Sequence, residues 1–385
     1  MSRLFLEDGR TEVELGGEEA PRALLARGRG EESELFATLA PIDPGAPRTR
    51  EHVLLARQVG VATLDLDGEG EVAVGPIVVS ATRGDDLVRI SVLDVAALRG
   101  RGPEVSIRTG RGDDDVELLA VAGEGAALAR AFIATGRGDD DVAFHLSSAG
   151  TADGFRVEVS TGAGSDRAAG KTFVDPSSSS GSSGESPAPT GRPSVDRISM
   201  GAGDDQLGRY FCDENRADVA PVEPGGGPTS VIRLGSGDDM ALVDQFSPMF
   251  GGALRVSGGR GNDVIQVNVT GWDFLSERAA RLPSVEGGRG EDRFVLERGE
   301  TSARIRDFEV GTDLIALAGG LEVDDLRIKA QGRDAAVFDA DGALLALVGA
   351  RGRLDPADLD RGAFVLHDED AFDVPPEPDR GDVAL

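Results

Sequence analysis

Cysteine and large aromatic residues are almost absent from this chain of 385 residues. Cys212 is the only cysteine, which excludes an internal disulfide and a metal site built from several thiolates. Tyr210 and Trp272 are the only tyrosine and tryptophan, so little surface is available for stacking on sugars. The histidines at positions 52, 145 and 367 lie in separate segments and form no zinc-binding motif. Few catalytic arrangements are therefore open to the chain.

Basic residues are also in short supply relative to acidic ones. The chain has 40 Lys and Arg against 69 Asp and Glu, a formal net charge of −29. This balance argues against nucleic acid and against an anionic membrane surface as a partner. So much negative charge repels itself in a compact state unless cations neutralise it.

Long apolar runs are missing as well. No segment is apolar enough to span a membrane, and the first residues, MSRLFLEDGRTEVE, contain no stretch typical of a signal peptide. We therefore expect a protein that stays in the cytoplasm or leaves the cell by a route that ignores its N-terminus.

Glycine, by contrast, is abundant, and much of it belongs to an internal repeat of nine residues. Seven segments share a Gly-x-Gly pair followed by Asp at the sixth position: TGRGDDDVE (109–117), TGRGDDDVA (135–143), TGAGSDRAA (161–169), MGAGDDQLG (200–208), LGSGDDMAL (234–242), GGRGNDVIQ (258–266) and GGRGEDRFV (287–295). TRGDDLV (82–88) and EVGTDLI (309–315) fit with one glycine lost. Asp is invariant at position six: Asp86, Asp114, Asp140, Asp166, Asp205, Asp239, Asp263, Asp292 and Asp313.

Apolar residues flank each turn at alternating positions, as in VSIRT before and DVEL after the first full repeat. This period of two predicts a half-buried strand on each side of a Gly/Asp turn. The aspartates are spaced by 28, 26, 26, 39, 34, 24, 29 and 21 residues, which suits a parallel β-solenoid with one turn per coil. The two longest intervals contain polar Ser/Gly/Pro-rich segments, which we expect to be loops extruded from the coils.

These turns carry the chemistry of a calcium site. Ca²⁺ takes about six to eight oxygen ligands from carboxylates and backbone carbonyls. Glycine lets the chain adopt positive φ angles that point carbonyls inward, and the Asp at position six adds a charged oxygen. One turn supplies about half a shell, so we expect each ion to be shared by two stacked turns, with at most eight sites between nine turns. The candidate ligands are Asp86, Gly110, Gly112, Asp114, Gly136, Gly138, Asp140, Gly162, Gly164, Asp166, Gly201, Gly203, Asp205, Gly235, Gly237, Asp239, Gly259, Gly261, Asp263, Gly288, Gly290, Asp292 and Asp313.

Over about residues 79–350 the chain resembles the RTX, or hemolysin-type calcium-binding, repeat proteins. GGRGNDVIQ and GGRGEDRFV match every specified position of the repeat Gly-Gly-x-Gly-x-Asp-x-U-x. RDFEVGTDLIAL (306–317) and GRDAAVFDADGALLALVGA (332–350) are similar to the motif and hairpin that close such repeats. The resemblance implies bound Ca²⁺, an extracellular location and export, unfolded, through a type I secretion machinery led by a C-terminal signal. Family members usually run their repeats in tandem; one repeat per coil implies calcium along a single edge.

The expected organisation is an all-β, right-handed parallel β-solenoid (β-roll or β-helix). We expect an N-terminal cap or small β region over 1–60, with a hairpin around Asp8-Gly9. The solenoid covers 61–320, with loop insertions at about 172–196 and 208–230. Closing strands follow at 321–366, and 367–385 is an acidic tail and a candidate secretion signal.

The sequence favours a secreted calcium-binding protein with a structural or surface-associated role and no catalysis of its own. Two alternatives stay open: an extracellular polysaccharide-modifying enzyme, such as a lyase or epimerase on a β-helix, and an adhesin or biofilm-matrix protein. An enzyme needs a convergent cleft of Asp, His or Arg on a strand face. An adhesin needs an exposed apolar or charged patch and a glycan or cell-surface partner.

Overall fold

A computed structural model of the chain describes fourteen segments, and the account below concerns these alone. They are residues 2–5, 9–15, 23–39, 51–67, 73–93, 104–122, 130–149, 156–175, 195–214, 229–246, 253–270, 282–298, 303–359 and 361–367.

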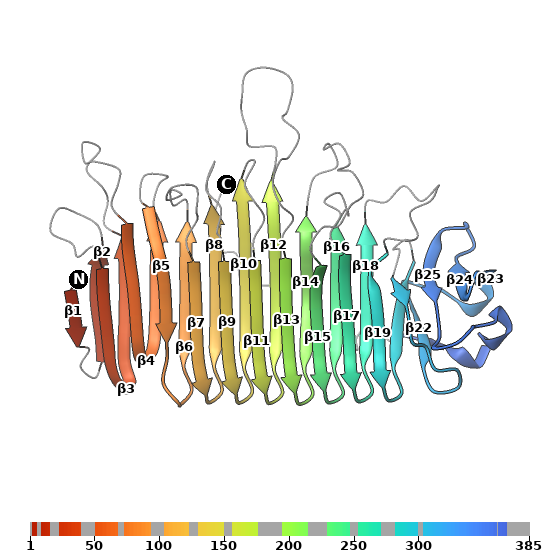
Figure 1. Cartoon of the computed structure of the whole chain (residues 1–385), viewed down its shortest axis with the longest axis horizontal. Coiled ribbons are helices and arrows are strands. Elements are labelled where there is room, and N and C mark those ends of the chain that lie inside the picture. The colour runs from red at the N-terminus through yellow and green to blue at the C-terminus, as the bar shows by residue number, and fades with distance from the viewer. Residues whose placement is uncertain are drawn as a thin grey trace, which may run out of the picture.

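The described residues form a parallel β-solenoid with almost no helix, so the predicted fold class is confirmed. Each coil gives one strand to each of two sheets, joined by a tight Gly/Asp turn at the lower edge of Figure 1. The incoming strands lead into these turns: β5 (Ala73–Ser80), β7 (Glu104–Arg111), β9 (Arg130–Arg137), β11 (Arg156–Ala163), β13 (Val195–Ala202), β15 (Thr229–Ser236), β17 (Ala253–Arg260), β19 (Ser284–Arg289) and β21 (Arg304–Ile305). The outgoing strands leave them: β6 (Leu87–Leu93), β8 (Asp115–Ala122), β10 (Asp141–Ala149), β12 (Arg167–Asp175), β14 (Gln206–Glu214), β16 (Met240–Phe246), β18 (Val264–Thr270), β20 (Arg293–Glu297) and β22 (Leu314–Ala318).

The core fills the space between the two sheets. Inward positions alternate with outward ones along each strand, because successive side chains of a β-strand point to opposite faces. Ile107 and Ile133 are fully buried and lie opposite each other on β7 and β9. Phe144 occupies the space beside Gly170 in the next coil, where an added Cβ would come within 2.3 Å of its ring. The alternating apolar positions of the sequence are therefore the positions that stack from coil to coil.

The coil stack extends to the N-terminal strands of the chain. β1 (Ser2–Phe5) and β2 (Gly9–Leu15) both pair in parallel with β3 (Ala23–Leu39), which pairs in parallel with β4 (Glu51–Asp67). β4 then pairs with β5 and, further along, with β6. The predicted hairpin around Asp8-Gly9 is therefore wrong. Each of the two strands instead pairs with its own part of β3, residues 24–27 for β1 and residues 33–39 for β2.

The two predicted insertions lie largely outside the described residues. β12 ends at Asp175 and β14 ends at Glu214, and the strands that follow, β13 and β15, begin at Val195 and Thr229. On both sides of each gap the strands pair within the same two sheets: the incoming strands stay in register, whereas β14 pairs with β12 and β16 through register shifts. The repeat thus resumes in place after each long interval, as the sequence predicts.

The C-terminal end of the stack is closed by a small antiparallel unit. β23 (Arg327–Gln331), β24 (Asp334–Phe338) and β25 (Leu344–Val348) pair in sequence, which places the predicted hairpin at β24 and β25. β25 continues the incoming sheet beside β21, and β26 (Phe364–Leu366) continues the outgoing sheet beside β22. Three single-turn helices complete the unit: η3 (Val323–Asp325), η4 (Pro356–Asp358) and η5 (Arg361–Ala363). Across the described segments, no helix is both long and apolar enough to cross a membrane.

Candidate metal-binding edge

The Gly/Asp turns stand in single file along one edge of the solenoid (Figure 1). The strand register aligns the first glycine of each Gly-x-Gly pair with the corresponding glycine of the next coil. The aligned residues are Gly110, Gly136, Gly162, Gly201, Gly235, Gly259 and Gly288. Irregular intervals in the sequence therefore become a regular column in space, and every predicted site residue lies in that column.

Glycine is required at these positions because the coils approach each other closely. Gly138 has a φ of 127°, and a Cβ built on it would lie 1.9 Å from the carbonyl oxygen of Gly112 in the preceding coil. The same relation recurs at Gly164 and Gly203, with the same distance of 1.9 Å. The carbonyl of each second glycine therefore faces the Cα of its counterpart rather than a side chain. Any larger residue would push the coils apart.

The aspartates at position six form a buried file next to these glycines. Their exposed fractions range from 0% to 4%. The Oδ1 atom of each one after Asp86 accepts a hydrogen bond from the backbone N–H of the aspartate in the preceding coil, over 2.9–3.2 Å. Eight such bonds join Asp86, Asp114, Asp140, Asp166, Asp205, Asp239, Asp263, Asp292 and Asp313 into one chain.

The second carboxylate oxygen has no such partner in the inner turns. Six Oδ2 atoms are buried without any hydrogen bond, those of Asp114, Asp140, Asp166, Asp205, Asp239 and Asp263. The two ends of the file differ. Thr82 donates its backbone N–H to Oδ2 of Asp86 over 2.8 Å, and Glu309 does the same for Asp313 over 2.7 Å. A buried carboxylate oxygen without a donor is costly, and a proton or a cation at each of these six turns would offset that cost.

Burial raises the pKa of these aspartates well above the ordinary value. The pKa reaches about 7 for Asp205 and Asp263, and about 6 for Asp114 and Asp140. Removal from water is the main cause; hydrogen bonds oppose it, and neighbouring carboxylates add to it. The same cause raises the pKa of Asp166, Asp239, Asp292 and Asp313. The file is therefore poorly suited to carry full negative charge by itself.

Threonine at position one of three turns does not supply the missing donor. The Thr109 hydroxyl lies near Asp114 and lowers the pKa of its carboxyl, but it donates its hydrogen bond to the Thr135 carbonyl over 3.2 Å. The hydroxyls of Thr135 and Thr161 likewise donate to backbone carbonyls of the next coil, over 3.0 and 2.7 Å. Each threonine proton is thus committed to the backbone, and Oδ2 stays without a donor.

Oxygens from two coils converge at Gly258, the residue at position one of its repeat. A Cβ built on Gly258 would lie 2.2 Å from Oδ2 of Asp263 and 2.6 Å from the carbonyl oxygen of Gly287. A Cβ on Gly287 would lie 2.1 Å from Oδ2 of Asp292. Two acceptors gathered at one point, without a proton between them, are a suitable environment for a cation.

A second file of oxygen-bearing side chains, at position five, was missed in the sequence. Here the later coil donates, as in the bonds from Asp139 N–H to Asp113 Oδ1 and from Asp238 N–H to Asp204 Oδ1, both 2.9 Å. The position varies in type along the file: Asp85, Asp113, Asp139, Ser165, Asp204, Asp238, Asn262 and Glu291. These side chains are exposed, and the frequent Asp or Asn next to the invariant Asp was the available signal.

Carboxylates alone do not build a metal site. Within the described ranges, no three His, Cys, Asp or Glu side chains come together in a geometry that could hold a metal. A cation at this edge would therefore depend on backbone carbonyls as well as on the position-six aspartates. That combination of hard oxygen donors matches the preference of Ca²⁺.

Away from this edge, one polar cluster lies on the outward side of the outgoing sheet. Gln266 Nε2 donates to Glu297 Oε2 over 2.8 Å, and Asn268 Nδ2 donates to Asp244 Oδ1 over 3.0 Å. The two amides thus tie up the carboxylates in hydrogen bonds, and neither His nor Arg takes part in these bonds.

Comparison with known families finds no matching family model, and comparison with curated proteins finds no significant match.

Proposed function

We propose that the chain binds calcium ions along its file of Gly/Asp turns and needs them to fold. The observation that carries the proposal is the set of six buried Oδ2 atoms without a donor, spaced one per coil along one edge. The carboxylates of Asp114, Asp140, Asp166, Asp205, Asp239 and Asp263 would supply the charged ligands. The carbonyls of the turn glycines would supply the neutral ones.

Calcium fits this edge better than other common metals. The candidate ligands are all oxygen atoms, whereas zinc and copper prefer nitrogen or sulfur. Mg²⁺ demands a near-ideal octahedron and keeps several of its waters. Stacked turns that share backbone carbonyls favour the larger ion with its adaptable coordination.

Folding and calcium binding would be coupled. Without a cation, the position-six aspartates either stay protonated or carry uncompensated charge in a buried file, and their raised pKa values express this cost. The chain as a whole also carries a formal charge of −29. Divalent ions would offset both the cost of the buried aspartates and the repulsion from the net charge. The free energy of calcium binding would therefore contribute directly to the free energy of folding.

Circular dichroism during a calcium titration tests this proposal. Chelator-treated protein at pH 7.5 should lack the strong β signal, gain it cooperatively at about 0.1–1 mM Ca²⁺, and lose it again with chelator. The same concentrations of Mg²⁺ should not replace calcium. Calcium-independent β structure, with no calcium bound at equilibrium dialysis, would overturn the proposal.

We further propose a secreted protein with a structural or surface-associated role, in line with the resemblance to RTX repeat proteins. A chain whose folding depends on calcium would remain unfolded at the low calcium concentration of the cytosol and would fold outside the cell. Expression of the full chain beside a type I exporter, against a chain lacking residues 367–385, tests the route. Equal amounts of both in the culture medium would contradict a signal in that segment.

A further inference from the structure

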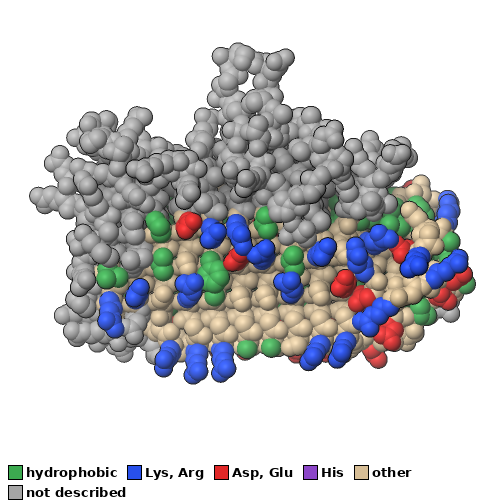
Figure 2. Space-filling model, in the orientation of Figure 1, with side chains coloured by type: hydrophobic (Ala, Val, Ile, Leu, Met, Phe, Trp, Pro, Cys, Tyr) green, Lys and Arg blue, Asp and Glu red, His purple; other side chains and the backbone are tan. Residues whose placement is uncertain are grey.

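The incoming sheet carries an excess of arginine on its outward side, against the strongly acidic average of the chain. Its outward charged residues are Arg108, Arg130, Arg156, Arg197, Arg233, Arg255 and Arg304, with only Glu104, Glu158 and Glu286 of opposite sign. Figure 2 shows Lys and Arg side chains spread over this sheet, and a further row of them along the turn edge. That row consists of position-three arginines, Arg83, Arg111, Arg137, Arg260 and Arg289. We call the seven outward arginines of the sheet the arginine face.

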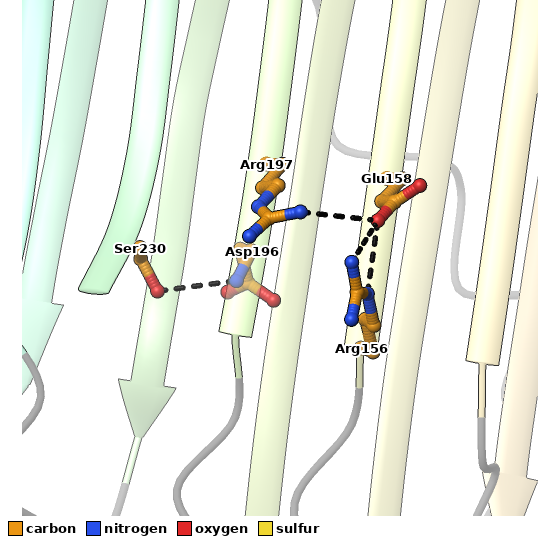
Figure 3. Close-up of polar contacts among 5 residues, drawn as sticks. All are labelled: Arg156, Glu158, Asp196, Arg197 and Ser230. Atoms are coloured by element: carbon orange, nitrogen blue, oxygen red, sulfur yellow. Dashed lines mark hydrogen bonds and ion pairs between the residues drawn. The ribbon is translucent and has the colours of Figure 1, made fainter. Parts of the chain in front are cut away.

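Among the described residues, ion pairs engage three of these seven arginines, and one of the pairs joins Arg304 to Asp334. Glu158 lies between two of them, 2.7 Å from Arg156 and 3.6 Å from Arg197 (Figure 3). One carboxylate thus pairs with two guanidinium groups, so Arg156, Arg197 and Glu158 together keep a net charge of about +1. Arg233 and Arg255 make no ion pair with any residue in the described part of the chain.

The outgoing sheet offers a useful contrast. Its Arg89 pairs with Glu117 over 3.4 Å and approaches Asp115 at 3.9 Å, both on the next coil. Opposite charges are therefore interleaved there, as on an ordinary solvated surface. The positive excess belongs to one sheet of the solenoid.

The arginines stand clear of a flat surface and recur along its long axis. Arg233 lies between Ser199 and Ser257 in its column, and Arg197 and Arg255 flank Val231 in the neighbouring column. Three successive coils thus each carry one exposed guanidinium, at a rise of about 4.8 Å per coil. Such a row matches an extended polymer with regularly spaced negative groups rather than a small ligand.

We propose that the arginine face binds a linear anionic polysaccharide, laid across the coils, through its carboxylate groups. Guanidinium groups bind carboxylates with two parallel hydrogen bonds, which suits this chemistry. Single-stranded nucleic acid fits less well, because it needs aromatic platforms for its bases. Only Phe132, on whose ring Arg108 already packs at 4.7 Å, is aromatic among the described outward residues of this sheet.

The experiment measures binding of the full chain to immobilised hyaluronate, a linear polymer with one carboxylate per disaccharide that does not gel with calcium. Neutral dextran and oligo(dT) serve as competing probes. Each sample is first shown to be folded by circular dichroism, in calcium or without it. A failure of the calcium proposal therefore stays distinct from a failure of this one.

The test variant is R233Q/R255Q, and the control is R167Q/R293Q, which removes two exposed arginines from the outgoing sheet. We expect the test variant to bind hyaluronate about three- to thirty-fold more weakly and the control to bind within about twofold of the wild type. Binding should also weaken as NaCl rises from 50 to 500 mM, because exposed ion pairs are screened. Equal losses in both variants, no binding by folded protein, equal binding of dextran, or tighter binding of oligo(dT) would each overturn the proposal.

Discussion

Replacing Asp140 by Asn separates a calcium ligand from a residue that merely holds two coils together. Asn keeps the size of the side chain and an Oδ1 atom that can accept the Asp114 N–H, at 3.0 Å in the present structure. The change removes the charge and puts an amide group in place of the buried Oδ2. The two roles therefore predict different outcomes with and without calcium.

Without calcium, the substitution should not weaken the fold at pH 8. Burial raises the pKa of Asp140 to about 6, so the ionised carboxylate costs folding at most about 3 kcal/mol relative to water. Asn carries no charge and avoids this cost. We expect any β signal left in chelator to be equal to or greater than that of the wild type.

With calcium, the same substitution should weaken the fold. Losing the charge from one ligand costs about 2 kcal/mol, as for hydrogen bonds to charged groups. If six ions bind together, as the six Oδ2 atoms suggest, this cost is spread over all of them. The calcium midpoint should then rise about twofold, whereas an isolated site would show a rise of about thirtyfold.

Glu117→Gln is the matched control, because it removes the same charge from β8, where Glu117 is only half-buried and pairs with Arg89. Calcium titrations followed by circular dichroism should place its midpoint near that of the wild type. The reasoning fails if both variants shift the midpoint equally, or if D140N destabilises the protein to the same degree with and without calcium.

Three further predictions concern the turns, their protonation and the core. Gly138→Ala should lower the free energy of unfolding in saturating calcium by about 2–5 kcal/mol, because its φ is 127° and its Cβ would meet the Gly112 carbonyl. The control is Gly342→Ala, where φ is 90° but no atom lies near the added Cβ, and it should lower the free energy of unfolding by only about 1–2 kcal/mol. Similar denaturant midpoints for the two would contradict the close approach of the coils. The pKa values of the position-six aspartates are higher in the folded than in the unfolded chain, so the calcium-free solenoid should be more stable at pH 5 than at pH 8. The calcium midpoint should rise as pH falls below about 7, roughly tenfold per pH unit for each proton that an ion displaces. A midpoint independent of pH between 5.5 and 7.5 would count against aspartate ligands. Phe144→Ala should cost about 3–5 kcal/mol in urea unfolding, since the ring fills the space beside Gly170, and a loss below 1 kcal/mol would mean that the coils collapse onto the cavity.

The turns could be predicted from the sequence because their residue types are dictated by contact. Gly138 has no room for a Cβ, and Asp140 accepts a hydrogen bond from a neighbouring coil, so the same two residue types recur in every full repeat. The strands beside them follow from the alternation of apolar residues. These local requirements survive the irregular intervals, which change only the loops between coils.

Other features, such as the position-five file and the arginine face, depend on which residues lie next to each other in neighbouring coils. The sequence alone does not show these neighbours. The position-five file includes Ser165 and Glu291 as well as aspartates, because exposed side chains there are less constrained. Arg197, Arg233 and Arg255 are 36 and 22 residues apart in the sequence and become neighbours only through the strand register. The N-terminal strands carry no Gly-x-Gly-x-Asp turn, so nothing local in the sequence indicated that β1 and β2 each pair with β3.

The ends of the aspartate file limit how many ions it can hold. Nine turns would allow eight sites if every gap between turns were equivalent. However, backbone donors already satisfy Oδ2 of Asp86 and of Asp313, so the terminal carboxylates differ from the inner ones. Thr82 replaces the first glycine of its repeat and Glu309 that of the last, and these two residues supply the donors. The file is therefore closed at both ends, and among the seven aspartates between them six, all but Asp292, have a buried Oδ2 without a donor, which favours six ions rather than eight.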